Sequence, residues 1–250
     1  MAVLTETCDD DRPNVITHVA TTTASVHEVN NTATVQEALV GLGLPPAEHF
    51  ADAGFVTAEL LVSGRDARGI NLIGPPRPGS NWQGNTAGAY RAEHFEVDWE
   101  NKRVRCPQGK HSSRWLEYNK ADEEPFVSAR FRPADCAGCP VRSLCTRSKS
   151  QGRNVRLPPR QQYEAMKGMR AFLGSELGRQ AYARRSGIEG TISQGVRAFG
   201  LRRSRYWGEA RTHLQHVATA VAMNFSRISD WLEGVPRERT RTSRLARLVA

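Results

Sequence analysis

The basic segment at residues 181–211, AYARRSGIEGTISQGVRAFGLRRSRYWGEAR, is the part of the sequence that most strongly indicates the fold. It places the carboxylate of Glu189 among arginines. In a helix through Glu189, Arg185 lies one turn earlier and Tyr182 two turns earlier, so that all three side chains share one face. The spacing therefore brings a phenol, a guanidinium and a carboxylate together.

Two glycines, Gly187 and Gly190, flank this acid. Each one costs a helix interior about 1 kcal/mol relative to alanine. Close approach of a metal ion and a phosphate backbone to Glu189 would explain them. The alternative is a solvated Arg185–Glu189 ion pair beside a helix break.

Downstream, residues 199–207 interleave arginines with aromatic side chains, FGLRRSRYW, which is a composition typical of contact with phosphates. The net charge of the 250-residue chain is +9, which favours a polyanionic partner. The charge is uneven, because residues 1–60 contain a single basic residue, Arg12. We therefore expect a DNA-binding face that includes Arg197, Arg202, Arg203 and Arg205.

The N-terminus shows no export signal, since it is rich in Thr and Asp and lacks an apolar segment. The longest apolar run near the C-terminus, residues 217–223, is far too short to span a bilayer. We expect a cytoplasmic protein without membrane contacts.

The N-terminal region reads as a hairpin followed by a helix. Residues 2–8 and 14–23 are rich in Val, Ile and Thr and predict two strands. The acids between them, Asp9, Asp10 and Asp11, could be catalytic, but they favour a solvated turn because Asp and the following Pro13 are turn formers. Residues 32–42 predict a short helix that ends at Gly43.

Asp52 follows a short apolar strand and precedes a Gly turn in the sequence HFADAGF. An acid at the C-terminal end of a strand points into the crevice where α/β sheets bind ligands. From this sequence pattern alone, Asp52 is explained equally well as a helix-capping or turn residue. A helix from Thr57 and a buried strand at residues 69–74 complete this part, and the prolines of residues 75–78 end it.

In residues 79–157, short strand-like runs alternate with polar turns. This pattern predicts a β-rich insertion, with strands near 94–99, 103–106, 115–118 and 126–131. Residues 158–233 predict helices at 160–177 and 208–232, the second with one apolar stripe: Leu214, Val217, Val221, Phe225, Ile228 and Leu232. Residues 234–250 form a basic tail. The predicted domains are therefore 1–78, 79–157, 158–233 and 234–250.

Four of the five cysteines cluster within the insertion: Cys106, Cys136, Cys139 and Cys145. In a chain without export signals this spacing favours metal over disulfides, and four thiolates suit a structural, tetrahedral zinc site. His111 could replace one of them. The alternative is a group of reduced, partly buried thiols.

The run from Tyr182 to Leu214 resembles the C-terminal catalytic segment of DDE transposases from bacterial insertion sequences. The Tyr–Arg–Glu–Lys signature of that group is similar in spacing to Tyr182, Arg185 and Glu189. Its Lys falls at Val196, and the nearest basic residue is Arg197. The likeness extends upstream through Cys145, Cys106 and Asp52, and so covers most of the chain.

This resemblance implies an RNase H-like fold and metal-dependent DNA cleavage and strand transfer. Asp52 and Glu189 would each ligate one of two catalytic Mg2+ ions, because hard oxygen ligands suit that ion. Arg185 would orient Glu189 or a phosphate, and Tyr182 would hydrogen-bond near the site. DNA, as element ends and target, would be the partner, and the full-length protein would be a homodimer.

In that family the first Asp lies on a strand ahead of a hairpin like residues 2–23. That strand is missing here, which predicts a truncated transposase whose catalytic site is incomplete. The competing hypothesis is a non-catalytic, zinc-stabilised nucleic-acid-binding protein.

Overall fold

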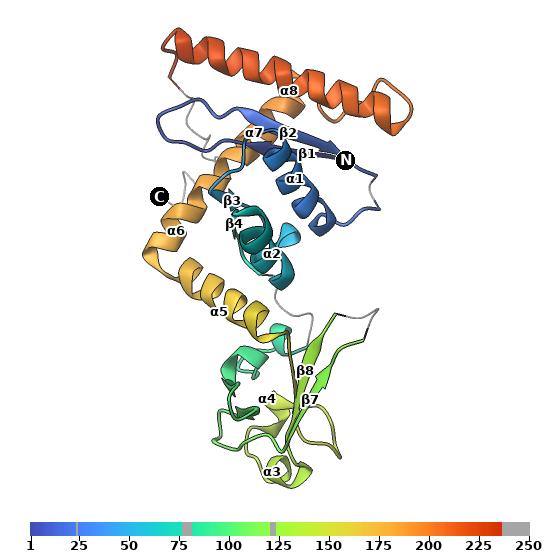
Figure 1. Cartoon of the computed structure of the whole chain (residues 1–250), viewed down its shortest axis with the longest axis vertical. Coiled ribbons are helices and arrows are strands. Elements are labelled where there is room, and N and C mark those ends of the chain that lie inside the picture. Colours follow the sequence, from blue (N-terminus) through green and yellow to red (C-terminus); the bar gives the residue numbers. More distant parts are fainter. Residues whose placement is uncertain (24, 77–81, 121–123, 237–250) are drawn as a thin grey trace, which may run out of the picture. The chain divides into compact units, whose positions relative to one another are not determined.

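The computed structural model describes residues 1–23, 25–76, 82–120 and 124–236 (Figure 1). It forms two compact units. The first comprises Met1–Val56, Gly64–Gly74 and the chain from Phe172 onward. The second comprises Thr57–Ser63 and Pro75–Ala171. Most of the expected basic tail, including Arg237 and the arginines beyond it, lies outside the described residues.

Two small sheets form the strands of the first unit. The predicted hairpin is present as the antiparallel pair β1 (Ala2–Glu6) and β2 (Ile16–Thr21). The predicted buried strands form the parallel pair β3 (Glu48–Phe50) and β4 (Asn71–Ile73). Helix α1 (Val29–Gly41) precedes β3, and α2 (Ala58–Arg68) lies between β3 and β4 in sequence.

Helices supply the rest of the first unit: α6 (Glu176–Ala183), the 3-10 turn η4 (Arg184–Ser186), α7 (Gly187–Ala198) and α8 (Glu209–Leu232). Helix α8 packs on β2, with Ala220 and Met223 buried against Ile16. The side-chain amide of Asn224 also pairs with Ile16, accepting from its N–H at 2.8 Å and donating to its carbonyl at 2.9 Å. This double hydrogen bond fixes the position of α8 along the hairpin.

The second unit is built from short antiparallel strands. β5 (Glu96–Asp98) pairs with β6 (Arg103–Arg105), and β7 (Arg114–Tyr118), β8 (Phe126–Arg130) and β9 (Asn154–Leu157) form a three-stranded sheet in that order. Two 3-10 turns, η2 (Trp82–Asn85) and η3 (Ala92–His94), precede β5, and two short helices, α3 (Pro133–Ala137) and α4 (Arg142–Cys145), lie between β8 and β9 in sequence. Their core contains Phe95, Val104, Ala129, Phe131 and Val155.

The mixed α/β class, with small sheets and several helices, is confirmed. One predicted helix, residues 160–177, is instead two: α5 (Arg160–Gly174) ends where Ser175 caps α6 by accepting a hydrogen bond from the N–H of Gly178. Strand β9 and the short helices α3 and α4 were not predicted. None of the described helices combines the length and apolarity needed to cross a membrane.

Gly74 controls how closely β4 approaches the chain after β3. A Cβ at this position would lie 2.2 Å from the carbonyl oxygen of Ala51 and 2.8 Å from a methyl of Val56. We predict that Gly74→Ala lowers the free energy of unfolding by about 1–3 kcal/mol, the usual cost of overpacking. Gly41→Ala is the control, because a Cβ there meets nothing within 4 Å. Equal unfolding midpoints in urea for the two variants would contradict this account.

Candidate functional site

One guanidinium joins the two acids that the sequence singled out. Arg185 donates from Nη1 to Oδ2 of Asp52 at 3.0 Å and from Nη2 to Oε1 of Glu189 at 2.8 Å. The Arg185 side chain is 20% exposed, whereas Asp52 is 56% and Glu189 67% exposed. Both carboxylates therefore remain open to solvent while a half-buried arginine holds them.

Asp52 stands at the carboxyl end of β3. The strand continues its pairing with β4 through the N–H of Ala51, which donates to Ile73 at 2.9 Å. Asp52 occupies the N-cap position of the 3-10 turn η1 (Ala53–Phe55), but its side chain makes no capping hydrogen bond. The capping role considered from the sequence is therefore wrong, since this carboxylate pairs with Arg185 instead.

Tyr182 completes the cluster from the helix before Arg185. Its hydroxyl donates to the carbonyl of Ala51 at 3.3 Å and lies 3.5 Å from Oδ1 of Asp52. The Arg185 guanidinium lies 5.8 Å from the ring centroid. Burial raises the pKa of Tyr182 above its ordinary value, with Arg185 acting in the opposite sense. The phenol is thus held as a neutral donor next to Asp52.

The two glycines beside Glu189 differ in their surroundings. A Cβ on Gly187 would lie 3.1 Å from the side-chain nitrogen of Asn14 and 3.5 Å from Oε1 of Glu6. A Cβ on Gly190 meets nothing within 4 Å. Close approach of the side chains of Asn14 and Glu6 therefore gives a structural reason for Gly187.

Sequence reasoning missed the group that holds α7 in place. Glu6 of β1 is 5% exposed and accepts hydrogen bonds at Oε2 from Thr191 of α7 and from Arg227 of α8. Arg227 also donates to Thr191 and to Gln194 of α7. The sequence signal for this group was Glu6 itself, a charged residue at the end of a strand rich in apolar residues and Thr. Its partner Arg227 lies far away in sequence.

The acidic turn between β1 and β2 contains Asp9, Asp10 and Asp11, and it has no regular structure. Asp10 lies 3.7 Å from Arg184, the residue before Arg185. The turn is therefore near the segment that carries the cluster.

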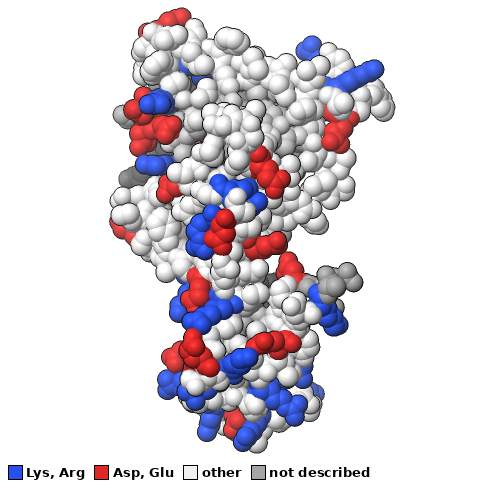
Figure 2. All heavy atoms as spheres, viewed as in Figure 1, with Lys and Arg blue, Asp and Glu red and all other residues white. Residues whose placement is uncertain are grey.

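The arginines expected to bind DNA are all exposed. Arg197 lies in the last turn of α7, and Arg202, Arg203 and Arg205 lie in the connection to α8. Buried Leu201 anchors this connection, and Gln215 accepts from the N–H of Arg205 at 2.9 Å and donates to the carbonyl of Arg203 at 2.7 Å. Trp207 is 93% exposed. Figure 2 shows basic side chains projecting at this end of α8.

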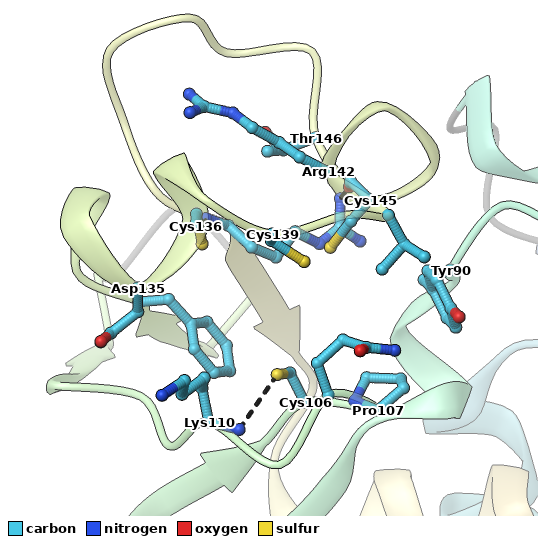
Figure 3. Close-up of a pocket in the computed structure, with 14 residues that line it drawn as sticks. Tyr90, Cys106, Pro107, Lys110, Asp135, Cys136, Cys139, Arg142, Cys145 and Thr146 are labelled. Atoms are coloured by element: carbon cyan, nitrogen blue, oxygen red, sulfur yellow. Dashed lines mark hydrogen bonds between the residues drawn. The ribbon is translucent and has the colours of Figure 1, made fainter.

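All four clustered cysteines line one small cavity of the second unit, of about 30 Å3 (Figure 3). Cys136, Cys139 and Cys145 come from α3, α4 and the turn between them, and Cys106 faces them from the end of β6. Backbone N–H groups donate to two sulfurs, Lys110 to Cys106 at 3.3 Å and Arg153 to Cys136 at 3.5 Å. Burial raises the pKa of Cys145 to about 11.

The sulfur positions do not form a ready-made tetrahedral site. Across the described ranges, no group of three or more His, Cys, Asp or Glu side chains is arranged to hold a metal ion. No zinc site is therefore found at Cys106, Cys136, Cys139 and Cys145, although all four line the same cavity, and zinc binding there stays a prediction. His111 is exposed. The two histidines of α8, His213 and His216, bond to Thr21.

The family profile of the transposase DDE domain matches residues 105–229, which is half of the chain. This chain belongs to the transposase DDE domain family. The matched segment contains the four clustered cysteines, Tyr182, Arg185 and Glu189, while Asp52 and the N-terminal hairpin precede it. No curated protein and no solved structure matches the chain. Membership in this family implies an enzyme of DNA transposition and a DNA substrate.

Arg185 should contribute more to stability than its neighbour Arg184. Arg185 is half-buried and bonds two carboxylates, whereas Arg184 is 46% exposed and lies 3.7 Å from one carboxylate, that of Asp10. We predict that Arg185→Ala lowers the free energy of unfolding by about 1 kcal/mol and that Arg184→Ala changes it little, as is usual for exposed pairs. Urea denaturation measures both values. If Arg184→Ala lowers the free energy of unfolding as much as Arg185→Ala does, the double contact of Arg185 with Asp52 and Glu189 makes no special contribution to stability.

Proposed function

We propose that this transposase-family chain carries the metal-binding carboxylates Asp52 and Glu189 of a DDE strand-transfer site in an RNase H-like domain. The observation that carries the proposal is the single guanidinium, Arg185, bonded to both acids. Asp52 comes from a strand end and Glu189 from a helix far along the chain. An exposed pair on one helix would not recruit a third group from a strand, so this convergence supports a site over a solvated helix pair.

The donor set suits a divalent metal ion such as Mg2+, which the family generally uses. Carboxylate oxygens are the hard ligands that this ion prefers, and both acids are more than half exposed. Such an ion supplies charge stabilisation to the attacking and leaving oxygens of a phosphodiester. Asp52 and Glu189 would hold it, Arg185 would orient Glu189 or contact a phosphate, and Tyr182 would fix Asp52 through its hydroxyl.

Two carboxylates make an incomplete set, and we propose that the chain is a truncated copy of the family's enzyme. In the resembled transposases a further Asp comes from a strand ahead of the hairpin. The sheet topology supports the proposal, because β1–β2 and β3–β4 form separate two-stranded sheets and an isolated two-stranded sheet is marginally stable. The candidate to replace that further Asp is an acid of the turn at residues 9–11, where Asp10 pairs with Arg184.

We also propose a structural zinc ion at Cys106, Cys136, Cys139 and Cys145. The cavity they line has room for an ion, and N–H donors already face two of the sulfurs, as expected around thiolates. Binding would expel the thiol protons and draw the sulfurs together. The second candidate function, a zinc-stabilised DNA-binding protein without chemistry, is favoured by the incomplete acid set.

The cleavage assay tests the proposed chemistry. We predict that the 250-residue chain nicks DNA poorly with Mg2+, because a misplaced catalytic group alone costs up to about 100-fold. An in-frame longer form should cleave, and Glu189→Gln in that form should abolish cleavage, while Gln180→Ala, on the preceding helix α6, serves as the control. Strong Mg2+-dependent nicking by the present chain, lost in Asp10→Asn, would show that the acidic turn supplies the third acid and that the truncation proposal is wrong.

DNA binding should be electrostatic and largely independent of sequence. Each phosphate neutralised adds about 0.9 to the slope of log K against log salt. We predict that replacing Arg202, Arg203 and Arg205 with Ala weakens binding and flattens that slope by about 2–3, measured by fluorescence anisotropy. Replacing Arg103, Arg105 and Arg114 of the second unit is the matched control. If the control flattens the slope and the first set does not, the DNA-binding face lies elsewhere.

Zinc is tested by elemental analysis of the purified chain. We predict about one zinc ion per chain, lost in Cys139→Ala and retained in Cys8→Ala, whose thiol lies outside the cluster. Chelation should unfold the second unit, because structural zinc contributes directly to folding free energy. A zinc-free protein whose four cluster thiols all react freely with a thiol reagent would remove the proposed site.

A further inference from the structure

Helix α8 has two apolar faces, and one of them is exposed among the described residues. Its inner face packs on the hairpin through His216, Ala220 and Met223. Its other face carries the outer stripe, which we define as Leu214, Ala218, Val221, Phe225, Ile228 and Leu232. Leu214, Phe225 and Leu232 are 69%, 71% and 72% exposed.

Such a contiguous exposed apolar surface marks an interaction site. The part of the molecule where Figure 1 draws α8 is largely free of charged side chains on the face seen in Figure 2. The sequence periodicity predicted five of these six residues, with Val217 in place of Ala218, and the structure turns the stripe outward.

The outer stripe is symmetric along the helix. Leu214 and Leu232 are equally distant from position 223, and so are Ala218 and Ile228, and Val221 and Phe225. A second helix running in the opposite direction therefore meets every stripe residue with a stripe residue. This self-complementarity is what a twofold, isologous contact requires.

The charges beside the stripe fit the same arrangement. Arg211 near the start of α8 and Glu233 at its end are separated by about six helical turns, so they lie on the same flank of the stripe. In an antiparallel pair like flanks face one another. Arg211 of one copy then lies beside Glu233 of the other, offset by about 3 Å along the axis.

We propose that the outer stripe is the surface through which two copies of this chain associate, as an antiparallel pair of α8 helices. The occupant is a second copy because both the apolar pattern and the flanking charges are complementary to themselves. Burial of the stripe is driven by the hydrophobic effect, and the two Arg211–Glu233 contacts set the direction of the helices. This inference does not depend on the phosphodiester chemistry.

Sedimentation equilibrium of the full chain tests the proposal. We expect a dimer at micromolar concentration. Val221→Asp and Phe225→Asp should each raise the dissociation constant more than about tenfold, as for buried residues at the centre of an interface. Leu177→Asp, on the exposed face of α6, is the control and should leave the dimer intact. Because all three side chains are exposed, circular dichroism should show a folded chain in each case.

Charge reversal tests the direction of the pair. Arg211→Glu and Glu233→Arg should each raise the dissociation constant by about two- to fivefold, and the double variant should restore it. A monomeric wild-type chain at about 100 μM, or a dimer unaffected by Val221→Asp and Phe225→Asp, would overturn the proposal. Failure of the double variant to restore association would overturn the antiparallel arrangement.

Discussion

A buried ion pair between the first strand and the last helix holds the first unit together. Glu6 and Arg227 have side chains only 5% and 15% exposed, and the guanidinium lies 2.9 Å from the carboxylate. Thr191 of α7 bonds to both. Removing one partner of a buried pair costs about 3–5 kcal/mol, since the other charge stays buried without compensation. The helix that carries Glu189 is therefore fixed to β1 and α8 at once, which allows Arg185 to reach Asp52 on one side of that helix.

Local pattern predicted most elements and the key spacing, because those depend on near neighbours in sequence. The spacing brings Tyr182, Arg185 and Glu189 together, although the expected single helix is three consecutive elements, α6, η4 and α7, and Asp52 follows strand β3. The Glu6–Arg227 pair was out of reach, because no local pattern links a strand residue to a helix residue 221 positions later. The division of residues 160–177 into two helices is a local feature, in which Ser175 caps α6 and Gly178 comes close to the carbonyl of Phe172.

Helix α8 and the cysteine cluster show where periodicity and spacing stop being informative. The more apolar face of α8 points outward, because the inner face satisfies His216, Asn224 and Arg227 by hydrogen bonds to the hairpin. Burial there depends on specific polar partners that hydrophobic periodicity does not detect. The cysteine spacing likewise predicted that four thiols lie together, and they line one cavity. Their coordination geometry depends on the side-chain rotamers of the cysteines, which a bound metal ion would determine.

We propose that Asp52 and Glu189 together bind a divalent ion. Iron(II) can replace Mg2+ at an oxygen-ligand site, and with ascorbate and peroxide it generates radicals that cut the backbone close to the bound ion. If the two acids bind the ion, the backbone is cut near residues 52 and 189. Excess Mg2+ should suppress these cuts, and they should be absent in both Asp52→Asn and Glu189→Gln. Cuts confined to other segments, or cuts near these residues that persist in both variants, would contradict it.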